Sequence, residues 1–359
     1  MNVAKTGTRI LFTGQYAAGT NSLYLAQAFQ QCGATIRFLN DIAIFPYWNT
    51  LGGRILRRLQ LPVILREWNV RLLQEVDRFK PDLVYVTDGH LAYQETIQKI
   101  RDRGVPIMCF YHDVHWKNRQ YSRFDQCLDL FDLVATTRQW HEAEFKMAGA
   151  KHVMVVRFGY NPQVHHPVIS NERIRQVYGS EMCFIGTKEA QRVMDLTRLV
   201  SGDFPYDFKI WGSLWNTLPD TSPILRYRQG MTALEDEIAL IYATNKIALH
   251  WVGWDPSSSN EQLRKGDQHN SRTFQIAACN GAMMMAQRTD EHRAFFVEDQ
   301  EAVFFDTPDE LLEKLAYWMV PERDDARREI AQAAYARCIR EDYSYVPVVK
   351  RFLTHFQLA

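Results

Sequence analysis

A glycine followed by two cations could hold a diphosphate in the second half of this sequence. Gly186 comes directly after the short apolar segment 182–185, and Lys188 and Arg192 follow it at the start of an expected helix. Glycine lets the backbone approach an anion closely, a helix start offers unpaired N–H groups, and lysine and arginine neutralise phosphate charge. The pattern predicts a diphosphate site, with a solvated helix start as the alternative.

A similar turn follows the first apolar segment, residues 9–13. Gly14 and Gln15 open a polar loop that leads into a helix expected near residues 22–32. The spacing matches neither G-x-G-x-x-G nor G-x-x-x-x-G-K-[ST], so an ordinary strand-to-helix turn stays open beside a binding loop. In the binding interpretation, Gly14 and Gln15 contact an anion or a polar substrate.

Acidic and imidazole side chains that could move a proton follow two further apolar segments. Asp88 and His90 come after the third segment, and His112 and Asp113 come after the fourth. A histidine or an aspartate within reach of a hydroxyl can act as its general base. We therefore expect His112 and Asp113 to be catalytic and Asp88 and His90 to contact the substrate whose hydroxyl is activated. A capping aspartate and a hydrogen-bonded loop histidine are the alternatives.

His112 and His115 stand three residues apart, a spacing that could suggest a metal site. No third ligand lies nearby in the sequence, whereas zinc sites in proteins use three or four protein ligands. We therefore expect no bound metal and no cofactor.

Polar side chains also gather where one expected helix begins. Arg272, Thr273 and Gln275 lie at the start of a helix predicted over residues 271–279, which ends at Asn280 and a glycine. This pair favours a left-handed helix cap, and a buried strand follows it. Such a helix start could bind an anion, with a merely packed helix as the alternative.

Eleven short apolar segments, separated by helical patterns, run from one end of the chain to the other. Segments that are apolar on both faces and spaced by helix-length stretches are typical of parallel strands buried under helices. The alternation predicts an α/β fold. The segments are residues 9–13, 35–39, 82–87, 106–111, 133–136, 152–158, 182–185, 208–211, 247–252, 282–286 and 302–305.

The sequence predicts two doubly wound, Rossmann-like domains facing a central cleft. Glycine, proline and histidine interrupt any regular element over residues 159–181, so we expect domains at 1–165 and 166–340. A helical tail, residues 341–359, is expected to pack back on the first domain. Ligands of such folds bind at the carboxyl ends of the strands. The polar stretch 253–270 is expected to form a mobile loop over that cleft.

Charge and composition narrow the class of protein. The 359 residues are 46% apolar and 23% charged, as in a globular protein rather than a disordered one. Residues 1–165 contain 20 basic and 14 acidic side chains, a net charge of +6, and residues 166–359 contain 22 and 28, a net charge of −6. The overall balance argues against a nucleic-acid partner. The basic first half favours an anionic or membrane-associated acceptor.

The sequence predicts a cytoplasmic protein. Its six cysteines show no C-x-x-C spacing and lie mostly in apolar segments, which indicates reduced, buried thiols. No apolar run approaches 18 residues, and the start lacks the apolar core of a signal peptide. The basic, leucine-rich stretch 51–80 could contact the inner face of a membrane peripherally, with a solvated helix face as the alternative.

The stretch from Arg272 to Asn280 resembles the nucleotide-sugar site of GT-B glycosyltransferases, specifically the CgeB-like spore-maturation group with its R-x-F-E-I-x-A-C-G signature. The resemblance extends over about residues 80–340 and rests on the order and spacing of several pieces. They are the strand 131–137, the hinge 149–167 with departures at Arg157 and Asn161, the F-I-G turn at 182–186, and the strand and helix 304–315.

The resemblance implies a metal-independent glycosyltransferase that binds its donor in the second domain. Gly186, Lys188 and Arg192 would lie near the diphosphate, and Arg272 and Gln275 near diphosphate or ribose. Thr273 and His250 are further donor candidates. Gln275 stands where the family has glutamate, so its amide can accept one ribose hydrogen bond but also donates.

The expected partners are a nucleotide-sugar donor and a glycan, protein or lipid-linked acceptor, with no nucleic acid. Arginine and lysine would stabilise the leaving diphosphate in place of a metal ion. Two other functions stay open: a nucleotide-sugar epimerase of the same fold, and a non-catalytic carbohydrate-binding or assembly protein.

Overall fold

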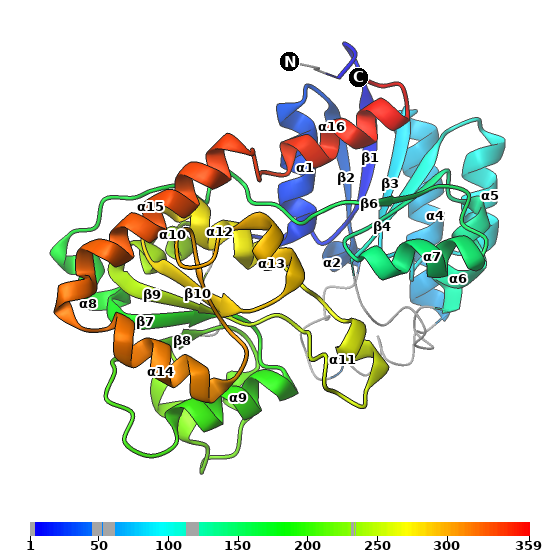
Figure 1. Cartoon of the computed structure of the whole chain (residues 1–359). Helices are drawn as coiled ribbons and strands as arrows, with labels where there is room; N and C mark the ends of the chain where they lie inside the picture. Colours follow the sequence, from blue (N-terminus) through cyan, green and yellow to red (C-terminus); the bar gives the residue numbers. More distant parts are fainter. Residues whose placement is uncertain (1–3, 45–51, 53–61, 113–121, 231–232, 234) are drawn as a thin grey trace. The chain divides into compact units, whose positions relative to one another are not determined.

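The computed structural model describes residues 4–44, 52, 62–112, 122–230, 233 and 235–359, and it divides into two compact units (Figure 1). Unit 1 comprises Met1–Phe158, Ser258–Lys265 and Tyr345–Ala359, and unit 2 comprises Gly159–Ser257 and Gly266–Ser344. The chain passes into unit 2 after Phe158, seven residues before the boundary expected from sequence. From Tyr345 to Ala359 it belongs to unit 1 again.

Unit 1 contains a six-stranded sheet in the order β2-β1-β3-β4-β5-β6, in which every neighbouring pair is parallel. The strands are β1 (Arg9–Gly14), β2 (Thr35–Asn40), β3 (Leu83–Thr87), β4 (Ile107–Tyr111), β5 (Leu133–Thr136) and β6 (Val153–Val155). The helices are α1 (Asn21–Gln31), α2 (Asp41–Ile44), α4 (Pro62–Phe79), α5 (Gln94–Asp102), α6 (Ser122–Cys127), α7 (Gln139–Met147), α11 (Glu261–Lys265) and α16 (Val346–His355), with a 3₁₀ turn η2 (Leu128–Leu130).

Alternate residues of the unit 1 strands pack on opposite faces of the sheet. On one face, Phe12 stacks on Tyr85 at 3.9 Å between ring centroids, and Phe29 of α1 contacts both Tyr85 and Phe352 of α16. The other face packs against α4, α5, α6 and α7 through buried aliphatic and aromatic side chains. Because both faces are covered, the inner strands β3, β4 and β5 are largely apolar, as the sequence pattern indicated, whereas the edge strand β2 carries polar residues as well.

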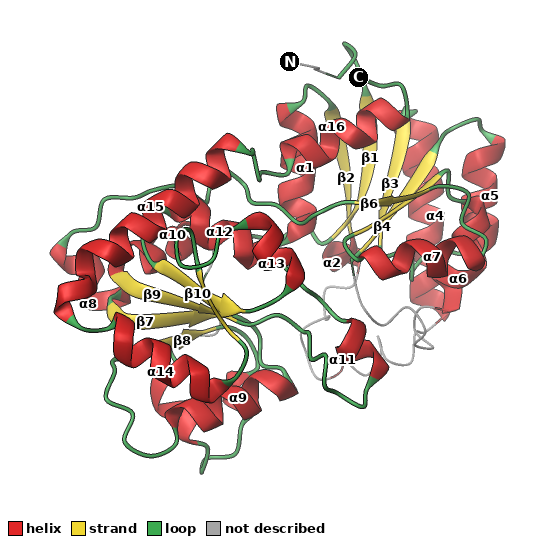
Figure 2. Cartoon of the chain, in the orientation of Figure 1, coloured by secondary structure: helices red, strands yellow, loops and turns green. Residues whose placement is uncertain are grey.

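Unit 2 contains a five-stranded parallel sheet in the order β11-β10-β9-β7-β8 (Figure 2). The strands are β7 (Ser180–Ile185), β8 (Phe208–Trp211), β9 (Asn245–His250), β10 (Met283–Gln287) and β11 (Val303–Phe305). The helices are α8 (Glu172–Tyr178), α9 (Ala190–Val200), α10 (Asp236–Thr244), α12 (Ser271–Cys279), α13 (Asp290–Phe295), α14 (Pro308–Trp318) and α15 (Asp324–Arg340), with 3₁₀ turns η3 (Trp215–Thr217), η4 (Pro223–Tyr227) and η5 (Pro321–Arg323).

The unit 2 sheet is also covered on both faces. One face packs against α9 and α14 through a buried cluster that includes Phe184, Leu249 and Met285. Helices α10, α12 and α15 lie along the other face, where α12 packs on α15 (Figure 1). Trp211, the last residue of β8, is buried as well.

Local sequence explains where the key helix of unit 2 begins and ends. The Asn270 side chain accepts a hydrogen bond from Arg272 N at 2.9 Å, and the Thr273 hydroxyl accepts one from Asn270 N at 3.3 Å, so the two residues cap each other reciprocally. At the other end Asn280 adopts the left-handed conformation with φ 49°. The predicted bounds 271–279 are therefore confirmed.

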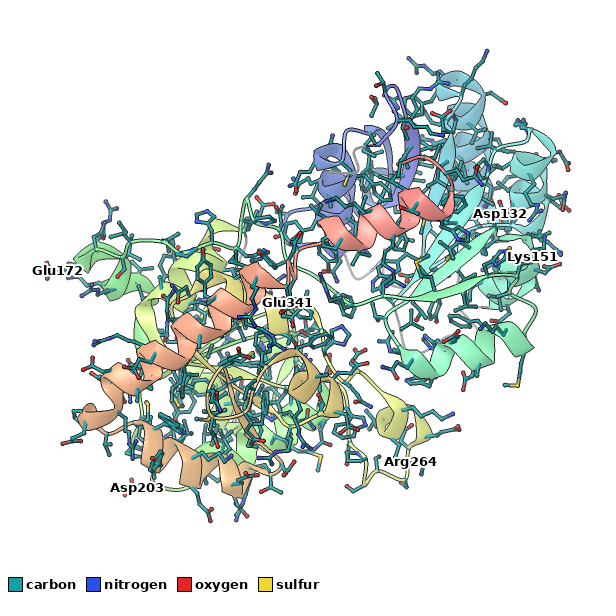
Figure 3. All side chains as sticks on the ribbon, turned by 45° about the horizontal axis from the view of Figure 1, so that its top comes forward. Asp132, Lys151, Glu172, Asp203, Arg264 and Glu341 are labelled. Carbon is teal, nitrogen blue, oxygen red and sulfur yellow. The ribbon has the colours of Figure 1, made fainter. Side chains whose placement is uncertain are left out.

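The predicted α/β fold with two parallel, Rossmann-like sheets is confirmed. Each of the eleven apolar segments forms a strand, and the differences are confined to one to four residues at their ends. Within the stretch 253–270, which was predicted to be a mobile loop, residues 261–265 form the short helix α11. Lys265 of α11 pairs with Glu144 at 3.2 Å and lies over the Trp140 ring. Figure 3 labels Arg264 on this helix.

All six cysteines are buried free thiols, which confirms the prediction from their apolar surroundings. No helix in the described part of the chain combines the length and the apolar character that a membrane crossing requires. In the basic stretch 51–80, Arg54, Arg57 and Arg58 lie outside the described residues. On α4, Arg66 and Arg71 are exposed, and Arg71 pairs with Glu67 one turn away.

Candidate functional site

The order of the strands fixes where each unit can bind a ligand. In unit 1, β1 lies between β2 and β3, so the chain leaves β1 toward one side and returns to the other side at β3. In unit 2, β7 lies between β8 and β9 in the same way. Doubly wound sheets bind ligands at such reversal points, beyond the carboxyl ends of the strands. The loops after β1 and β3, and those after β7 and β9, are therefore the candidate sites.

A cavity of about 270 Å³ lies at the reversal point of unit 1. It brings together four of the residues predicted from sequence: Gln15 after β1, Asp88 and His90 after β3, and His112 after β4. The remaining lining residues come from the start of α1 and the ends of β2 and β3, and they are Gly19, Thr20, Asn21, Ser22, Asp41 and Thr87.

Gly14 closes the strand end beneath this cavity. Its φ is +153°, and a Cβ atom there would lie 2.8 Å from Thr87 Oγ1 and 2.9 Å from Ser22 Oγ. These distances leave no room for a side chain, so glycine is required where β1, β3 and α1 meet. The structure thus gives Gly14 a packing role at the site.

Asp88 and His112 form a pair across the ends of neighbouring strands. His112 Nδ1 lies 3.1 Å from Asp88 Oδ1, and His112 N donates to the same carboxylate oxygen at 3.3 Å. Burial alone would raise the pKa of Asp88, but the charge of His112 and its hydrogen bonds outweigh burial and lower that pKa. A carboxylate that holds an imidazole in place is the arrangement used to orient a general base.

The carboxylate beside His112 is therefore Asp88, from the neighbouring strand. Asp113, which sequence reasoning had coupled to His112, lies outside the described residues. Because parallel strands end at the same edge, polar residues after β3 and β4 come close together although they are 24 positions apart.

Asp41 is a lining residue that the sequence analysis did not select. It directly follows β2, is only 8% exposed, and accepts a hydrogen bond from Trp68 Nε1 at 2.7 Å. Burial raises the pKa of Asp41 to about 7; the bond from Trp68 opposes this rise and the charge of Asp88 adds to it. A search of polar residues after every predicted strand would have found it.

The buried Asp41 predicts a pH dependence of stability. An unfolded aspartate has a pKa near 4, and the folded value is raised, so between these values the folded state holds a proton that the unfolded state has lost. Stability should therefore decline from about pH 4 to pH 7, by at most ~1.4 kcal/mol per pH unit. Urea unfolding of the wild type and of Asp41→Asn at pH 5 and pH 8 measures this. The variant should gain stability relative to the wild type at pH 8, and an equal difference at both pH values would contradict the prediction.

In unit 2, the turn after β7 is held by the segment after β8. Gly186 N donates to Trp211 O at 2.9 Å, and Gly186 O accepts from Trp215 Nε1 at 2.8 Å. Lys188 N donates to Ser213 O at 3.0 Å, and its Nζ donates to Thr217 Oγ1 at 2.6 Å. The glycine turn is thus a fixed platform, with the Lys188 ammonium at its edge.

Arg192, on the first turn of α9, is largely enclosed. Its guanidinium donates to Thr187 O at 3.0 Å and to Trp251 O at 3.2 Å, and it pairs with Glu189 at 3.0 Å. Burial lowers the pKa of Arg192; Glu189 and Asp267 oppose this, while Arg272 lowers the pKa further. Arg192 therefore ties the loops after β7 and β9 together and adds positive charge close to Arg272.

Arg272 and Gln275 lie one turn apart at the start of α12. Arg272 Nη1 donates to Gln275 Oε1 at 2.5 Å, and Gln275 is only 2% exposed. Since its carbonyl oxygen is used in this way, Gln275 holds the Arg272 guanidinium in place. Arg272 itself is partly exposed at the β7–β9 reversal point, where an anion can reach it.

The predicted direct contact of Thr273 and His250 with a donor does not fit their burial. Thr273 is fully buried and His250 is 2% exposed, and they hydrogen-bond each other at 3.0 Å. His292, which the sequence analysis did not select, lies 3.0 Å from the same hydroxyl through Nε2 and 2.7 Å from Gln287 O through Nδ1. These three side chains form a polar network beneath α12.

The network allows one assignment of protons. Burial lowers the pKa of His292 to about 4, so the ring is neutral, and its Nδ1 must carry the proton that faces the Gln287 carbonyl. Its Nε2 is then an acceptor for the Thr273 hydroxyl. That hydroxyl must in turn accept from His250 Nε2–H. Both imidazoles thus hold the first turn of α12 through one hydroxyl.

Removing this hydroxyl should destabilise the fold. Thr273→Val preserves shape but leaves two buried imidazoles without their partner, so we expect a loss of about 1–3 kcal/mol in the free energy of unfolding. Thr273→Ser keeps the hydroxyl and is the matched control. Denaturant unfolding of both variants measures this, and a Thr273→Val variant as stable as the wild type would show that the network does not contribute to stability.

A histidine–glutamate pair stabilises the same end of unit 2. His269, which is buried, forms a short hydrogen bond with Glu291 of α13, and its ring packs against Phe274 and Phe295. Neither residue was selected as a site residue from sequence. Among the described residues, no group of three or more histidine, cysteine, aspartate or glutamate side chains is arranged to hold a metal ion.

Residues 188–354 match a family model described as glycosyl transferase-like. The matched stretch includes Lys188, Arg192, His250, Arg272 and Gln275, and therefore most of the predicted donor residues. The narrower resemblance to the CgeB-like group stays a prediction. No curated protein matches the chain.

Three solved structures share the fold over nearly the whole chain. Sucrose-phosphate synthase from Thermosynechococcus elongatus aligns with a TM-score of 0.67 and 10% identity over 98% of each chain. Anabaena Alr3699/HepE in complex with UDP-glucose aligns with a TM-score of 0.64 and 12% identity over 97% of this chain and 99% of the other. A UDP-N-acetylglucosamine 2-epimerase aligns with a TM-score of 0.55 and 10% identity over 99% and 97%. The fold is therefore GT-B, as the sequence predicted.

Proposed function

We propose that this protein transfers a sugar from a nucleotide-diphosphate sugar to a hydroxyl of an acceptor. Unit 2 would bind the donor at the β7–β9 reversal point, and unit 1 would bind the acceptor in the cavity at the β1–β3 reversal point. The observation that most supports this is the position of Arg272 at the start of a helix that faces the carboxyl end of the sheet. Gln275 accepts a hydrogen bond from the Arg272 guanidinium, and the charge of Arg272 lowers the pKa of the nearby Arg192.

The donor site would work through fixed positive charge. Arg272 and Lys188 would contact the diphosphate, and the N–H groups at the start of α12 would add partial positive charge. The largely enclosed Arg192 would add to the positive potential of the site. Negative charge grows on the leaving diphosphate as the glycosidic bond breaks, so these groups stabilise the transition state more than the bound donor. Because HepE was solved with UDP-glucose, uridine diphosphate sugars are the first donors to test.

The acceptor site would activate a hydroxyl. In an inverting reaction, His112 oriented by Asp88 would take the hydroxyl proton as the oxygen attacks the sugar. The ten described lining residues include two carboxylates and two imidazoles but neither lysine nor arginine. This lining favours a neutral, hydroxyl-rich acceptor, such as a sugar, over the anionic acceptor suggested by the net charge of the first half.

Ligand binding and product analysis test the function. A panel of nucleotide-sugars should raise the melting temperature, with nucleoside diphosphate alone doing so as well, and candidate glycans should yield a transferred sugar. If no nucleoside diphosphate stabilises the protein, the donor site is refuted. A donor that changes configuration without any acceptor would instead identify an epimerase, and binding without turnover would identify a non-catalytic sugar-binding protein.

Metal independence is part of the proposal. If arginine and lysine replace a metal ion, activity should persist in excess EDTA and should not rise when Mg²⁺ or Mn²⁺ is restored. A loss of activity in EDTA that Mn²⁺ reverses would overturn this part alone.

A further inference from the structure

A cavity of about 580 Å³ lies in unit 2, at the opposite edge of the sheet from the candidate donor site. It lies where β9 begins at Asn245 and where Asn280 and Gly281 lead into β10, and α8 and α15 complete its walls. In Figure 1, α8 lies beside the beginning of α15, and Figure 3 labels Glu172 at the start of α8. The residues of the donor proposal follow the carboxyl ends of the strands, so this cavity is separate from them.

The lining of this cavity, which we call the α8–α15 cavity, is basic. Of its 14 lining residues, Arg175, Lys246, Arg327 and Arg328 are cationic, and Asp324 is the single acid. This concentration stands out because residues 166–359 as a whole have 22 basic and 28 acidic side chains, a net charge of −6. A basic cavity in an acidic domain favours an anionic ligand.

Arg175 contributes most of the charge that other side chains leave uncompensated. Its Nε donates to Ser170 Oγ at 3.2 Å, and within the described part of the chain it forms no ion pair. Arg175 is exposed on α8, a helix with no buried residue. Its guanidinium therefore keeps donors available for a ligand, and the fold does not depend on it.

The two arginines of α15 add to this positive potential. Arg327 is buried, donates to Trp318 O and pairs with Asp324, so its position is fixed. Burial lowers the pKa of Arg327, and the charge of Arg328 lowers it further, which shows that the two cations repel each other. Arg328 pairs with the highly exposed Asp325 at 2.7 Å, and such exposed pairs stabilise little. An anion in the cavity would relieve the repulsion.

We propose that the α8–α15 cavity binds a small phosphorylated polyol, with the phosphate on Arg175 and Arg328. Arginine is suited to phosphate because its N–H groups match the phosphate oxygens in pairs. No aromatic side chain is among the lining residues, so nothing there would stack on a nucleobase. The volume exceeds what a phosphate needs, and Thr244, Asn280 and Gln332 offer partners for hydroxyl groups.

Calorimetric titration of the full chain with glucose 6-phosphate tests the site, with glucose as the probe that lacks the phosphate. We expect one binding site for glucose 6-phosphate, no detectable binding of glucose, and unchanged binding when UDP is present. Hydrogen exchange should slow at residues 168–176 and 324–332. These results do not depend on whether the protein transfers sugars.

Two substitutions and one control locate the phosphate. Arg175→Ala and Arg328→Ala should each weaken glucose 6-phosphate about 10- to 100-fold, as expected for the loss of a charge-assisted hydrogen bond. Arg173→Ala removes an equally exposed cation of α8 that does not line the cavity, and it should leave binding unchanged. The proposal fails if glucose 6-phosphate does not bind, if UDP displaces it, or if the control loses as much affinity as the two variants.

Discussion

Arg272→Ala is expected to lower kcat/KM for the nucleotide-sugar about 10²- to 10³-fold, the range seen when a group that stabilises transition-state charge is removed. The reason lies in its position. Arg272 is the partly exposed cation on the first turn of α12, and Gln275 fixes its guanidinium at 2.5 Å. Binding of the nucleoside diphosphate alone should weaken less, about 10- to 100-fold, because the ground state has less charge to stabilise.

Three further variants separate charge from geometry. Arg272→Lys keeps the charge but loses the paired N–H groups, so its kcat/KM should fall between those of the wild type and the alanine variant. Gln275→Ala frees the guanidinium and should raise KM for the donor with the protein still folded. Arg293→Ala removes an exposed cation from α13 and should change neither parameter. Wild-type kinetics in Arg272→Ala would exclude that residue from the site.

The strands could be predicted because both faces of each sheet are buried. A parallel strand under helices is apolar at consecutive positions; β4 shows this over its whole length, and β3 and β10 show it at every position but the last. The edge strand β2 alternates between buried and exposed residues, so it gives a weaker signal. Asp41 follows that strand, which was nevertheless predicted, and the sequence analysis selected polar residues after β1, β3 and β4 but none after β2.

The roles of individual side chains depended on contacts between distant segments. Arg192 is enclosed because its guanidinium reaches Trp251 O, 59 positions away, which no local pattern reveals. Thr273 is buried because His250 and His292 approach it from two other elements. Sequence reasoning therefore selected the segments on which the donor proposal rests, whereas the division into exposed and supporting residues required the fold.

The residues of the unit 1 cavity, the proposed acceptor site, were also predictable one segment at a time, whereas their grouping depended on the fold. Gln15, Asp88, His90 and His112 were selected separately, and the strand order β1-β3-β4 brings them to one edge of the sheet. The charge of the lining could not be derived from the net charge of the first half. Most cations of that half belong to helices and loops away from the lining, which is acidic and imidazole-rich.

The Asp88–His112 pair should control the rate of an inverting transfer. His112→Ala is expected to lower kcat about 10²- to 10⁴-fold, the usual contribution of a general base, with little change in donor KM. Asp88→Asn keeps the size of the side chain but removes the charge that orients the imidazole and favours its protonated form. Its kcat should also fall, and Asp82→Asn, at the opposite end of β3, should behave as the wild type.

The pH profile distinguishes catalysis from a purely structural role of this pair. A general base must be unprotonated, and without the Asp88 carboxylate the imidazolium loses its ionic partner, so the acid limb of kcat/KM should move to lower pH in Asp88→Asn. The pKa of Asp88 is lowered in the folded state, so its contribution to stability is present above the unfolded pKa near 4 and is lost as pH falls through the folded value. The variant and the wild type should therefore converge in stability only in strong acid, whereas their activity profiles separate near neutral pH. A retaining enzyme would show no displaced acid limb in Asp88→Asn, because a retaining transfer needs no such base on the acceptor.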